Sequence, residues 1–448
     1  MDYQSFKEAV IAQCRELGVE EYELYYQAQE ALSVSAYQHE INEFSGNAEG
    51  GVCFRCIRNG KMGYASTEEL SREQAHRVVA RAMDNAANLE TEDRVFLGKG
   101  GQTYAKLDRK LTELPTTEQL IEAVLATQQE LYDADPSVVD GTVTEGISEK
   151  TSLAICNSNG LDLNYVNHFV GLVTVAVVCV GEEKANHFKI RLGQLDTIDR
   201  RRLAKETVEE TLKKLGGEVP ETGTYPVVFS PEAMASLLST YSGAFSSEAA
   251  QKGLSLLADS EGKVIASECV TIVDDPFHPE SPSPRVFDGE GSPTYRKNVV
   301  EKGVLNTLLY NMKTADKAGK VTTGNASKGS YAAAVGVRPF SMYLQSGELT
   351  EEELLQKAGS GIYINTLEGL HAGANAVSGD FSLQSAGYLI ENGVLTTHIK
   401  SFTVAGNFYE LLKKIVAVAN NSHLRNPTGR TAFGAPSVLV DNLSIAGK

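Results

Sequence analysis

The sequence has no long apolar run and few cysteines, and both absences narrow the class of protein. No stretch of about 18 consecutive apolar residues occurs in the 448 residues, so we expect no membrane-spanning helix. Six cysteines are too few for a disulfide scaffold in a chain of this length. The first residues, Met1 to Gln4, begin an amphipathic segment without the basic and apolar parts of a signal peptide. We therefore expect a cytoplasmic protein.

Basic residues are also scarce. The chain has 41 Lys and Arg against 58 Asp and Glu, which gives a formal net charge of −17. Its densest basic run is Arg200-Arg201-Arg202, close to Asp199 and Glu206 on an expected helix. Because duplex DNA is bound through a basic face, we expect no direct contact with nucleic acid. The apolar content of 42% and charged content of 22% are those of an ordinary globular protein of about three domains.

Of two familiar catalytic patterns, one is absent and the other lies where its two cysteines are expected to point apart. No Gly-x-Ser-x-Gly sequence occurs, which removes the usual hydrolase nucleophile turn. Cys53-x-x-Cys56 lies in an expected strand, where residues three apart face opposite sides of the sheet. These two cysteines are therefore expected to be structural.

What the chain contains is an α+β pattern with three expected domains at 1–110, 111–222 and 223–448. The first has helices at 4–17 and 68–89, strands at 22–27, 31–38, 51–57 and 62–65, and a polar turn at 43–51. Asn59-Gly60 predicts a hairpin, and Ser66-Thr67 is expected to cap the second helix.

The second domain repeats this pattern. Thr116 or Thr117 is expected to cap a helix that ends near Tyr132, followed by strands at 138–145, 149–156, 162–168 and 171–180 and a helix at 198–215. Two α/β N-terminal units with antiparallel sheets, and a possible duplication, follow from this order. Residues 223–448 contain many short strands, which predicts a mostly β domain of barrel or sandwich type.

One glycine-rich stretch, residues 369–407, stands out in the third domain. Short strands are expected at 380–383, 387–390 and 394–404, with a hairpin at Asn392-Gly393. His371 and Asp380 lie at the mouth of this meander. From composition alone it is an ordinary β-meander with turn glycines.

The same stretch resembles the C-terminal signature of the TldD/PmbA family. The resemblance is carried by Leu370-His371-x-Gly373-x-Asn375, Gly379-Asp380-Phe381-Ser382, residues 387–393 and Ala405-Gly406-Asn407, and it is nearest to the PmbA (TldE) branch. Residues 287–294 and 323–326 are similar to the family's central motif. Taken alone, 288–294 is either a tight turn, which we favour, or a loop that presents N–H groups to an extended peptide.

The family likeness also locates a zinc motif that this chain has lost. The TldD branch uses His-Glu-x-x-x-His, in which two imidazoles bind zinc and the carboxylate is the general base. Here Glu232 occupies the slot of the base, but Pro231 and Ser236 stand where the imidazoles would be. No cysteine follows Cys269, so the downstream ligand is missing too. Pro231-Glu232 then predicts a helix start with Ser230 as its N-cap.

The resemblance therefore implies a subunit with no catalytic residue, no metal and no cofactor of its own. It would be a PmbA/TldE-like pseudoenzyme subunit of a cytoplasmic metallopeptidase, formerly described as a modulator of DNA gyrase, with zinc in a TldD-like partner. His371, Asp380 and Asn407 are the candidates for a groove that holds an unfolded or extended peptide.

Alternatives stay open from the sequence alone. One is a homodimeric binder of peptides or proteins that modulates DNA gyrase without proteolysis. Another is an independent hydrolase with a non-zinc site. A metal site built from His371, Asp380 and His423 in three dimensions is a further alternative.

Overall fold

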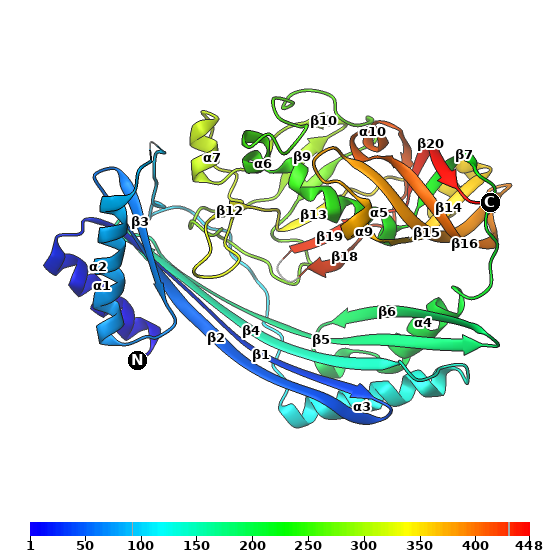
Figure 1. The fold of residues 1–448 in the computed structure, drawn as a ribbon, viewed down its shortest axis with the longest axis horizontal. Coiled ribbons are helices and arrows are strands. Elements are labelled where there is room, and N and C mark those ends of the chain that lie inside the picture. Colours follow the sequence, from blue (N-terminus) through cyan, green and yellow to red (C-terminus); the bar gives the residue numbers. More distant parts are fainter. Residues whose placement is uncertain (92, 429–430) are drawn as a thin grey trace. The chain divides into compact units, whose positions relative to one another are not determined.

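The computed structural model describes residues 1–91, 93–428 and 431–448. By its internal contacts the chain separates into two compact units, each described by itself below (Figure 1). Unit 1 contains Met1–Thr211, Arg285–Thr294 and Asn311–Gly336. Unit 2 contains Leu212–Pro284, Tyr295–Tyr310 and Val337–Lys448. Two segments from the C-terminal half of the sequence are therefore part of the N-terminal unit.

Unit 1 is built on one antiparallel six-stranded sheet in the order β3-β2-β1-β4-β5-β6. Its strands are β1 (Glu21–Tyr37), β2 (Glu40–Arg58), β3 (Lys61–Thr67), β4 (Val143–Asn157), β5 (Asp162–Val180) and β6 (Glu183–Leu192). The central strands β1 and β4 pair along almost their whole length. The two expected N-terminal units thus share a single sheet.

Each half of this sheet has the order helix, three strands, helix, as a duplication would give. The helices are α1 (Tyr3–Leu17), α2 (Arg72–Asn88), α3 (Thr117–Ala134) and α4 (Arg200–Leu212). Within unit 1, α1 and α2 lie at one end of the long strands and α3 and α4 at the other (Figure 1). Separate apolar clusters form under them, one around Phe6 and Phe54 and one around Leu120 and Leu172.

The strands are longer than the sequence predicts, and several expectations were wrong. The expected strands at 22–27 and 31–38 are one strand, and the expected polar turn at 43–51 is the exposed middle of β2. The second domain's four expected strands are β4 and β5, and β6 was not expected. The reason is that Glu40–Gly51 pairs with β1 through its backbone while its side chains stay largely exposed, so no alternation of apolar residues marks it.

Local signals at turns and helix starts were more reliable. Asn59 and Gly60 have φ of 52° and 72°, as the predicted hairpin turn requires. Thr116 caps α3 in a capping box with Gln119. The expected cap at Ser66-Thr67 was wrong, because Thr67 ends β3 and α2 starts after Ser71, whose side chain accepts from the Gln74 N–H.

Unit 2 contains a closed five-stranded barrel, which confirms the β-rich C-terminal domain. Strands follow one another around it in the order β16-β15-β14-β7-β20, and β16 pairs with β20 to close the ring. They are β7 (Gly223–Phe229), β14 (Gly361–Glu368), β15 (Asp380–Glu391), β16 (Val394–Asn407) and β20 (Val438–Ala446), with β17 (Ile415–Val418) added beside β20.

A second six-stranded sheet of unit 2 has the order β10-β9-β8-β13-β19-β18. Its strands are β8 (Ile272–Asp274), β9 (Lys297–Glu301), β10 (Val304–Leu305), β13 (Ser341–Leu344), β18 (His423–Thr428) and β19 (Thr431–Ala435). Helices α5 (Pro231–Tyr241), α6 (Ser247–Gln251), α8 (Glu351–Ala358), α9 (Leu370–Gly373) and α10 (Phe408–Lys413) connect these strands and those of the barrel. The remaining short elements are α7 (Met312–Lys317), β11 (Ala326–Ser327), β12 (Gly336–Val337), η1 (Leu195–Thr197) and η2 (Ser242–Phe245).

Candidate functional site

The barrel topology brings the candidate site residues named from the sequence to one end of the barrel, here called the barrel rim. Parallel strands β7 and β14 both end there, and β15 starts and β16 ends there because they run antiparallel to their neighbours. Glu232 follows β7, His371 follows β14, Asp380 opens β15 and Asn407 closes β16. Residues up to 175 positions apart in the chain thus meet at one barrel end.

Helix α5 crosses this end of the barrel. It starts directly after β7, and the Tyr241 hydroxyl at its last residue donates a 2.9 Å hydrogen bond to the Asp380 carbonyl at the start of β15. The Tyr241 ring stacks on Phe408, with ring centroids 4.6 Å apart. The other neighbours of α5 are β19, β18 and β13 of the second sheet. The helix therefore lies between the barrel end and that sheet.

The three positions that the family resemblance aligns with the zinc motif lie in the first turns of α5. Pro231 is buried at the first helical position behind the Ser230 cap, as predicted, and its ring nitrogen has no lone pair for a ligand bond. The Ser236 hydroxyl donates a 2.8 Å hydrogen bond to the Glu232 carbonyl. Glu232 itself is exposed. A carboxylate is one possible zinc ligand, and neither Pro231 nor Ser236 adds a nitrogen ligand beside it.

Asp380 and Asn407 form a polar clip between the ends of β15 and β16. The Asn407 amide donates 2.9 Å to the Asp380 carboxylate and 2.8 Å to the Ser378 carbonyl, while its oxygen accepts from the first N–H groups of α10. Hydrogen bonds from Asn407 and Ser378 lower the pKa of Asp380. These hydrogen bonds link the ends of β15 and β16, and Asp380 remains exposed to solvent.

His371 is exposed on the one-turn helix α9. His423 lies on β18, where its Nδ1 is 3.5 Å from Glu280. Among residues 1–91, 93–428 and 431–448, no three His, Cys, Asp or Glu side chains are grouped to hold a metal ion. The structure thus does not assemble the His371, Asp380 and His423 alternative.

The family-like residues 287–294 and 323–326 form a different structure in unit 1, here called the Asp288 turn. The Asp288 carboxylate is 1% exposed and accepts 2.9 Å hydrogen bonds from three backbone N–H groups, those of Glu290, Ser292 and Ala326. These N–H groups are therefore not offered to a peptide. The favoured prediction of a tight turn is confirmed.

Beside this turn lies a buried charge cluster that sequence reasoning missed. Glu23 and Arg55 are directly opposite each other in the β1–β2 pair, and the Arg55 Nε is 2.7 Å from the Glu23 carboxylate. Burial and the charge of Asp288 raise the pKa of Glu290 to about 7, and Arg55 opposes that shift. The Lys328 ammonium lies 4.3 Å from the centre of the Tyr25 ring. Knowing the strand register would have revealed the Glu23–Arg55 pair.

Cys53 and Cys56, which were expected to be structural, are buried free thiols, and so is Cys14. Burial raises the pKa of the Cys56 thiol to about 11 and of the Cys14 thiol to about 12. The pKa of Cys53 is raised for the same reason. A raised pKa keeps these thiols protonated at neutral pH, which disfavours a nucleophilic role.

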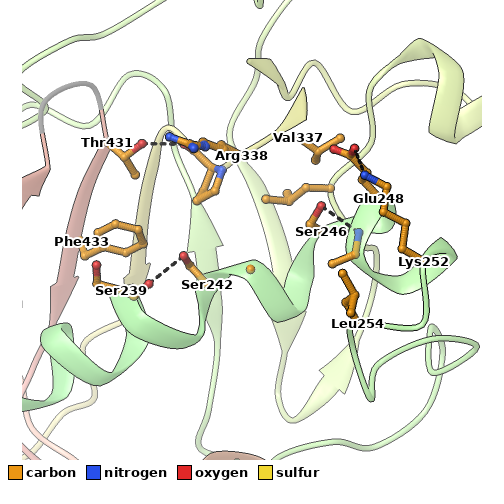
Figure 2. Close-up of a pocket in the computed structure, with 14 residues that line it drawn as sticks. Ser239, Ser242, Ser246, Glu248, Lys252, Leu254, Val337, Arg338, Thr431 and Phe433 are labelled. Atoms are coloured by element: carbon orange, nitrogen blue, oxygen red, sulfur yellow. Dashed lines mark hydrogen bonds and ion pairs between the residues drawn. The ribbon is translucent and has the colours of Figure 1, made fainter. Parts of the chain in front are cut away.

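Unit 2 has a cavity of about 440 Å³ at the C-terminal end of α5. Figure 2 shows Ser239 and Ser242 on the helix side and Arg338 and Thr431 opposite, with the Glu248–Lys252 pair at one edge. Apolar walls come from Leu254, Leu309, Val337 and Phe433. Its size is that of a small-ligand pocket. Nothing in the sequence marks it, because its residues come from separate segments.

No helix in the described part of the chain is both long and apolar enough to cross a membrane. Three models of the PmbA/TldA metallopeptidase family match the chain: domain 1 at residues 22–86, the central domain at 111–215 and the C-terminal domain at 222–447. The last alone covers half of the sequence.

The chain is similar to named proteins over nearly its full length. It is 25% identical over 427 residues to metalloprotease PmbA of Escherichia coli O157:H7, covering 93% of this chain and 90% of that one. A crystal structure described as a putative modulator of a DNA gyrase from Thermotoga maritima matches with a TM-score of 0.89 and 28% identity, over 99% of this chain and 100% of that one. TldE of Thermococcus kodakarensis, at 23% identity and a TM-score of 0.86, covers 98% and 100% and shows the fold alone.

Family members also occur as paralogue pairs. Buchnera aphidicola has both a metalloprotease TldD homolog, 24% identical to this chain, and a metalloprotease PmbA homolog, 22% identical. These two relatives match 95% and 93% of the chain, and the matches cover 92% and 91% of their own lengths.

Proposed function

Because this chain belongs to the PmbA/TldA metallopeptidase family, we propose that it is a PmbA/TldE-like subunit of a two-component cytoplasmic metallopeptidase. In this proposal a TldD-like paralogue supplies the zinc and the catalytic groups. The present chain holds an unfolded or extended peptide and carries no zinc. The peptide is degraded or matured by the assembled pair.

The observation that carries the proposal is which residues occupy the first turns of α5. Its first turn keeps a carboxylate at Glu232, but a buried proline and a hydrogen-bonded serine stand at the two imidazole positions. Neither side chain supplies a nitrogen ligand. These two residues support a subunit that acts through a partner or through binding alone.

In this proposal an extended peptide docks along the backbone of strand β18 in unit 2. Strand β18 ends the order of the second sheet, and α5 packs beside it. The backbone groups on the outer side of such a strand pair with an added peptide strand, which reads the backbone and not the side chains. This suits a substrate recognised because it is unfolded. His371, Asp380 and Asn407 at the barrel rim remain the proposed groove residues.

The second candidate is a homodimeric binder of peptides or proteins that acts without proteolysis, for example on DNA gyrase. It is favoured by the match to the Thermotoga maritima structure described as a putative gyrase modulator. The two candidates differ in one respect that can be measured directly. The first needs a TldD-like partner for activity, and the second needs none for binding its target.

The test combines metal content and peptide hydrolysis. The purified chain is analysed for zinc by mass spectrometry, and hydrolysis of an unstructured peptide is followed for the chain alone, a TldD-like paralogue alone and the mixture. We expect less than about 0.1 zinc per chain, no hydrolysis by the chain alone, and hydrolysis on mixing. Size-exclusion chromatography of the mixture checks that a complex forms.

Glu232→Gln supplies the decisive control. In the proposed subunit it leaves the zinc content unchanged. Stoichiometric zinc in the isolated chain, with hydrolysis that disappears in Glu232→Gln, would contradict the proposal. Hydrolysis by the chain alone in the presence of a chelator would instead identify an independent hydrolase with a non-zinc site.

A further inference from the structure

Unit 1 buries a guanidinium that has no counter-charge. Arg285 is 8% exposed, and within the part of the chain that the structure describes its buried Nη2 atom has no hydrogen-bond partner. Among the same residues, no carboxylate oxygen lies within 4 Å of its side-chain nitrogens. An arginine side chain cannot lose its charge in a protein, and a charge taken out of water is costly unless it is paired. A buried arginine is therefore normally found beside an acid, and Arg285 is an exception.

Arg55 shows the usual arrangement in the same unit. It is buried to a similar extent, and its Nε is 2.7 Å from the Glu23 carboxylate. Arg285 instead contacts the ring of Tyr165, whose centre lies 5.1 Å from the Arg285 Cζ. A ring face attracts a cation but carries no net negative charge. The contact with Tyr165 therefore orients the Arg285 side chain without neutralising it.

The backbone beside the Asp288 turn fixes where the Arg285 side chain starts. The Arg285 carbonyl accepts a hydrogen bond from the Thr294 hydroxyl, and the Val286 carbonyl accepts one from the Thr294 N–H at 3.1 Å. Phe287, two residues after Arg285, packs edge-on against Tyr165 with ring centroids 6.5 Å apart. The charged side chain thus leaves a hydrogen-bonded backbone next to aromatic rings.

The charge and exposure of Arg285 define the class of ligand that would complete this place. One positive charge is matched by a monoanion, whereas a dianion such as phosphate would leave a net negative charge buried. The planar fork of guanidinium N–H groups matches the two oxygens of a carboxylate. Because only 8% of Arg285 is exposed, the ligand must be small. A small monocarboxylate with apolar carbons meets all of these conditions.

We propose that Arg285 binds the carboxylate of a small monocarboxylic acid, whose apolar carbons contact Tyr165 and Phe287. The bound carboxylate supplies the counter-charge that the described residues do not. A ligand that binds only the folded chain raises its stability as the concentration of the ligand rises. The empty site, with its unpaired buried charge, makes the folded chain less stable, as binding sites often do.

The test is the melting temperature of the full chain at pH 7 in sodium acetate, compared with sodium chloride of the same ionic strength and with added acetamide. Acetamide has nearly the shape of acetate but no charge. Acetate is expected to raise the melting temperature with saturation, by about 3 °C at roughly ten times its Kd, and acetamide is expected to have no effect. This comparison uses the wild-type chain alone, so it does not depend on any variant that folds.

Arg285→Met removes the charge and keeps an unbranched side chain. It is expected to lose the response to acetate and to melt about 3 °C above wild type in sodium chloride, because no unpaired charge stays buried. Arg201→Met is the matched control, at an arginine of α4 whose side chain is 87% exposed. It is expected to keep both the wild-type melting temperature and the response to acetate.

Equal effects of acetate and acetamide on the wild-type chain overturn the proposal, as does an acetate effect that survives in Arg285→Met. A variant that melts below wild type in sodium chloride would make Arg285 a structural residue that acts through Tyr165. Phosphate that acts through Arg285 more strongly than acetate contradicts the match to a single charge. Acetyl-Ala-Glu-Ala-amide tests the source of the carboxylate, since stabilisation by this peptide but not by acetate contradicts a small ligand.

Discussion

The Asp288 turn and the barrel rim both carry family-like motifs of glycine, acidic and amide residues, and they use them in opposite ways. In the Asp288 turn the carboxylate is 1% exposed and its oxygens accept three backbone N–H groups. At the rim, Glu232, His371 and Asp380 are exposed. Similar motifs are therefore buried in a turn in one place and exposed to solvent in the other.

The largest expected effect is in the charge cluster beside the Asp288 turn. Arg55→Met leaves Glu23 buried without its guanidinium partner, and the free energy of unfolding should fall by about 3–5 kcal/mol. Replacing both partners, Arg55→Met with Glu23→Leu, should recover most of the loss because no unpaired charge stays behind. Urea unfolding of the three proteins measures both effects. An Arg55→Met variant as stable as wild type would show that the Glu23–Arg55 pair adds nothing to the free energy of unfolding.

Asp288→Ala is expected to cause the next largest loss of folding stability. It leaves three buried N–H groups without an acceptor, which costs at least about 2 kcal/mol. Asp380→Ala is the matched variant at the rim, where water replaces the lost acceptor, and its melting temperature should stay within about 2 °C of wild type. Thermal unfolding compares them. Equal losses in both variants would remove the distinction between the two regions.

Glu290 makes the stability of the Asp288 turn depend on pH. Its pKa is raised to about 7, with burial the largest cause and Asp288 the next. The folded chain therefore binds a proton more tightly than the unfolded chain does, so the stabilisation is complete below about pH 4.5 and is lost as pH rises to about 7. Above about pH 7, Glu290 no longer makes the folding stability change with pH.

Melting temperatures at pH 5 to 8 for wild type and Glu290→Gln test this dependence. The neutral amide still offers an oxygen to the Met312 N–H, which Glu290 accepts at 2.8 Å. We expect the variant to gain stability relative to wild type as pH rises from 5 to 7. Parallel curves for the two proteins would show that Glu290 has the same pKa in both states.

The sequence predicted features that depend on local chemistry. Hairpin turns such as Asn59-Gly60, helix caps such as Thr116 and Ser230, and the tight turn at Asp288 each follow from a few adjacent residues. The α+β class and the β-rich C-terminal domain followed from the density of short strands. Family resemblance located Pro231 and Ser236, which composition alone would have passed over.

Features that depend on strand register or distant segments were missed. The exposed middle of β2 has no apolar alternation, so its pairing with β1 is invisible in the sequence. The Glu23–Arg55 pair is 32 residues apart and needs that register. The cavity beside α5 needs Arg338, Thr431 and Ser239 in one place, which only the packing of α5 against β19 provides.

The smallest expected change in stability, and the sharpest test of the rim, is at His371. This side chain is exposed on α9, so His371→Ala should leave the melting temperature unchanged. If the rim holds the peptide, hydrolysis by the mixture with a TldD-like paralogue should fall about fivefold, the value of one lost hydrogen bond. His76→Ala, an exposed histidine on α2, is the control and should change neither property. Loss of stability in His371→Ala without loss of hydrolysis would make the rim structural like the Asp288 turn, because only a side chain that contacts the peptide affects turnover while leaving the fold intact.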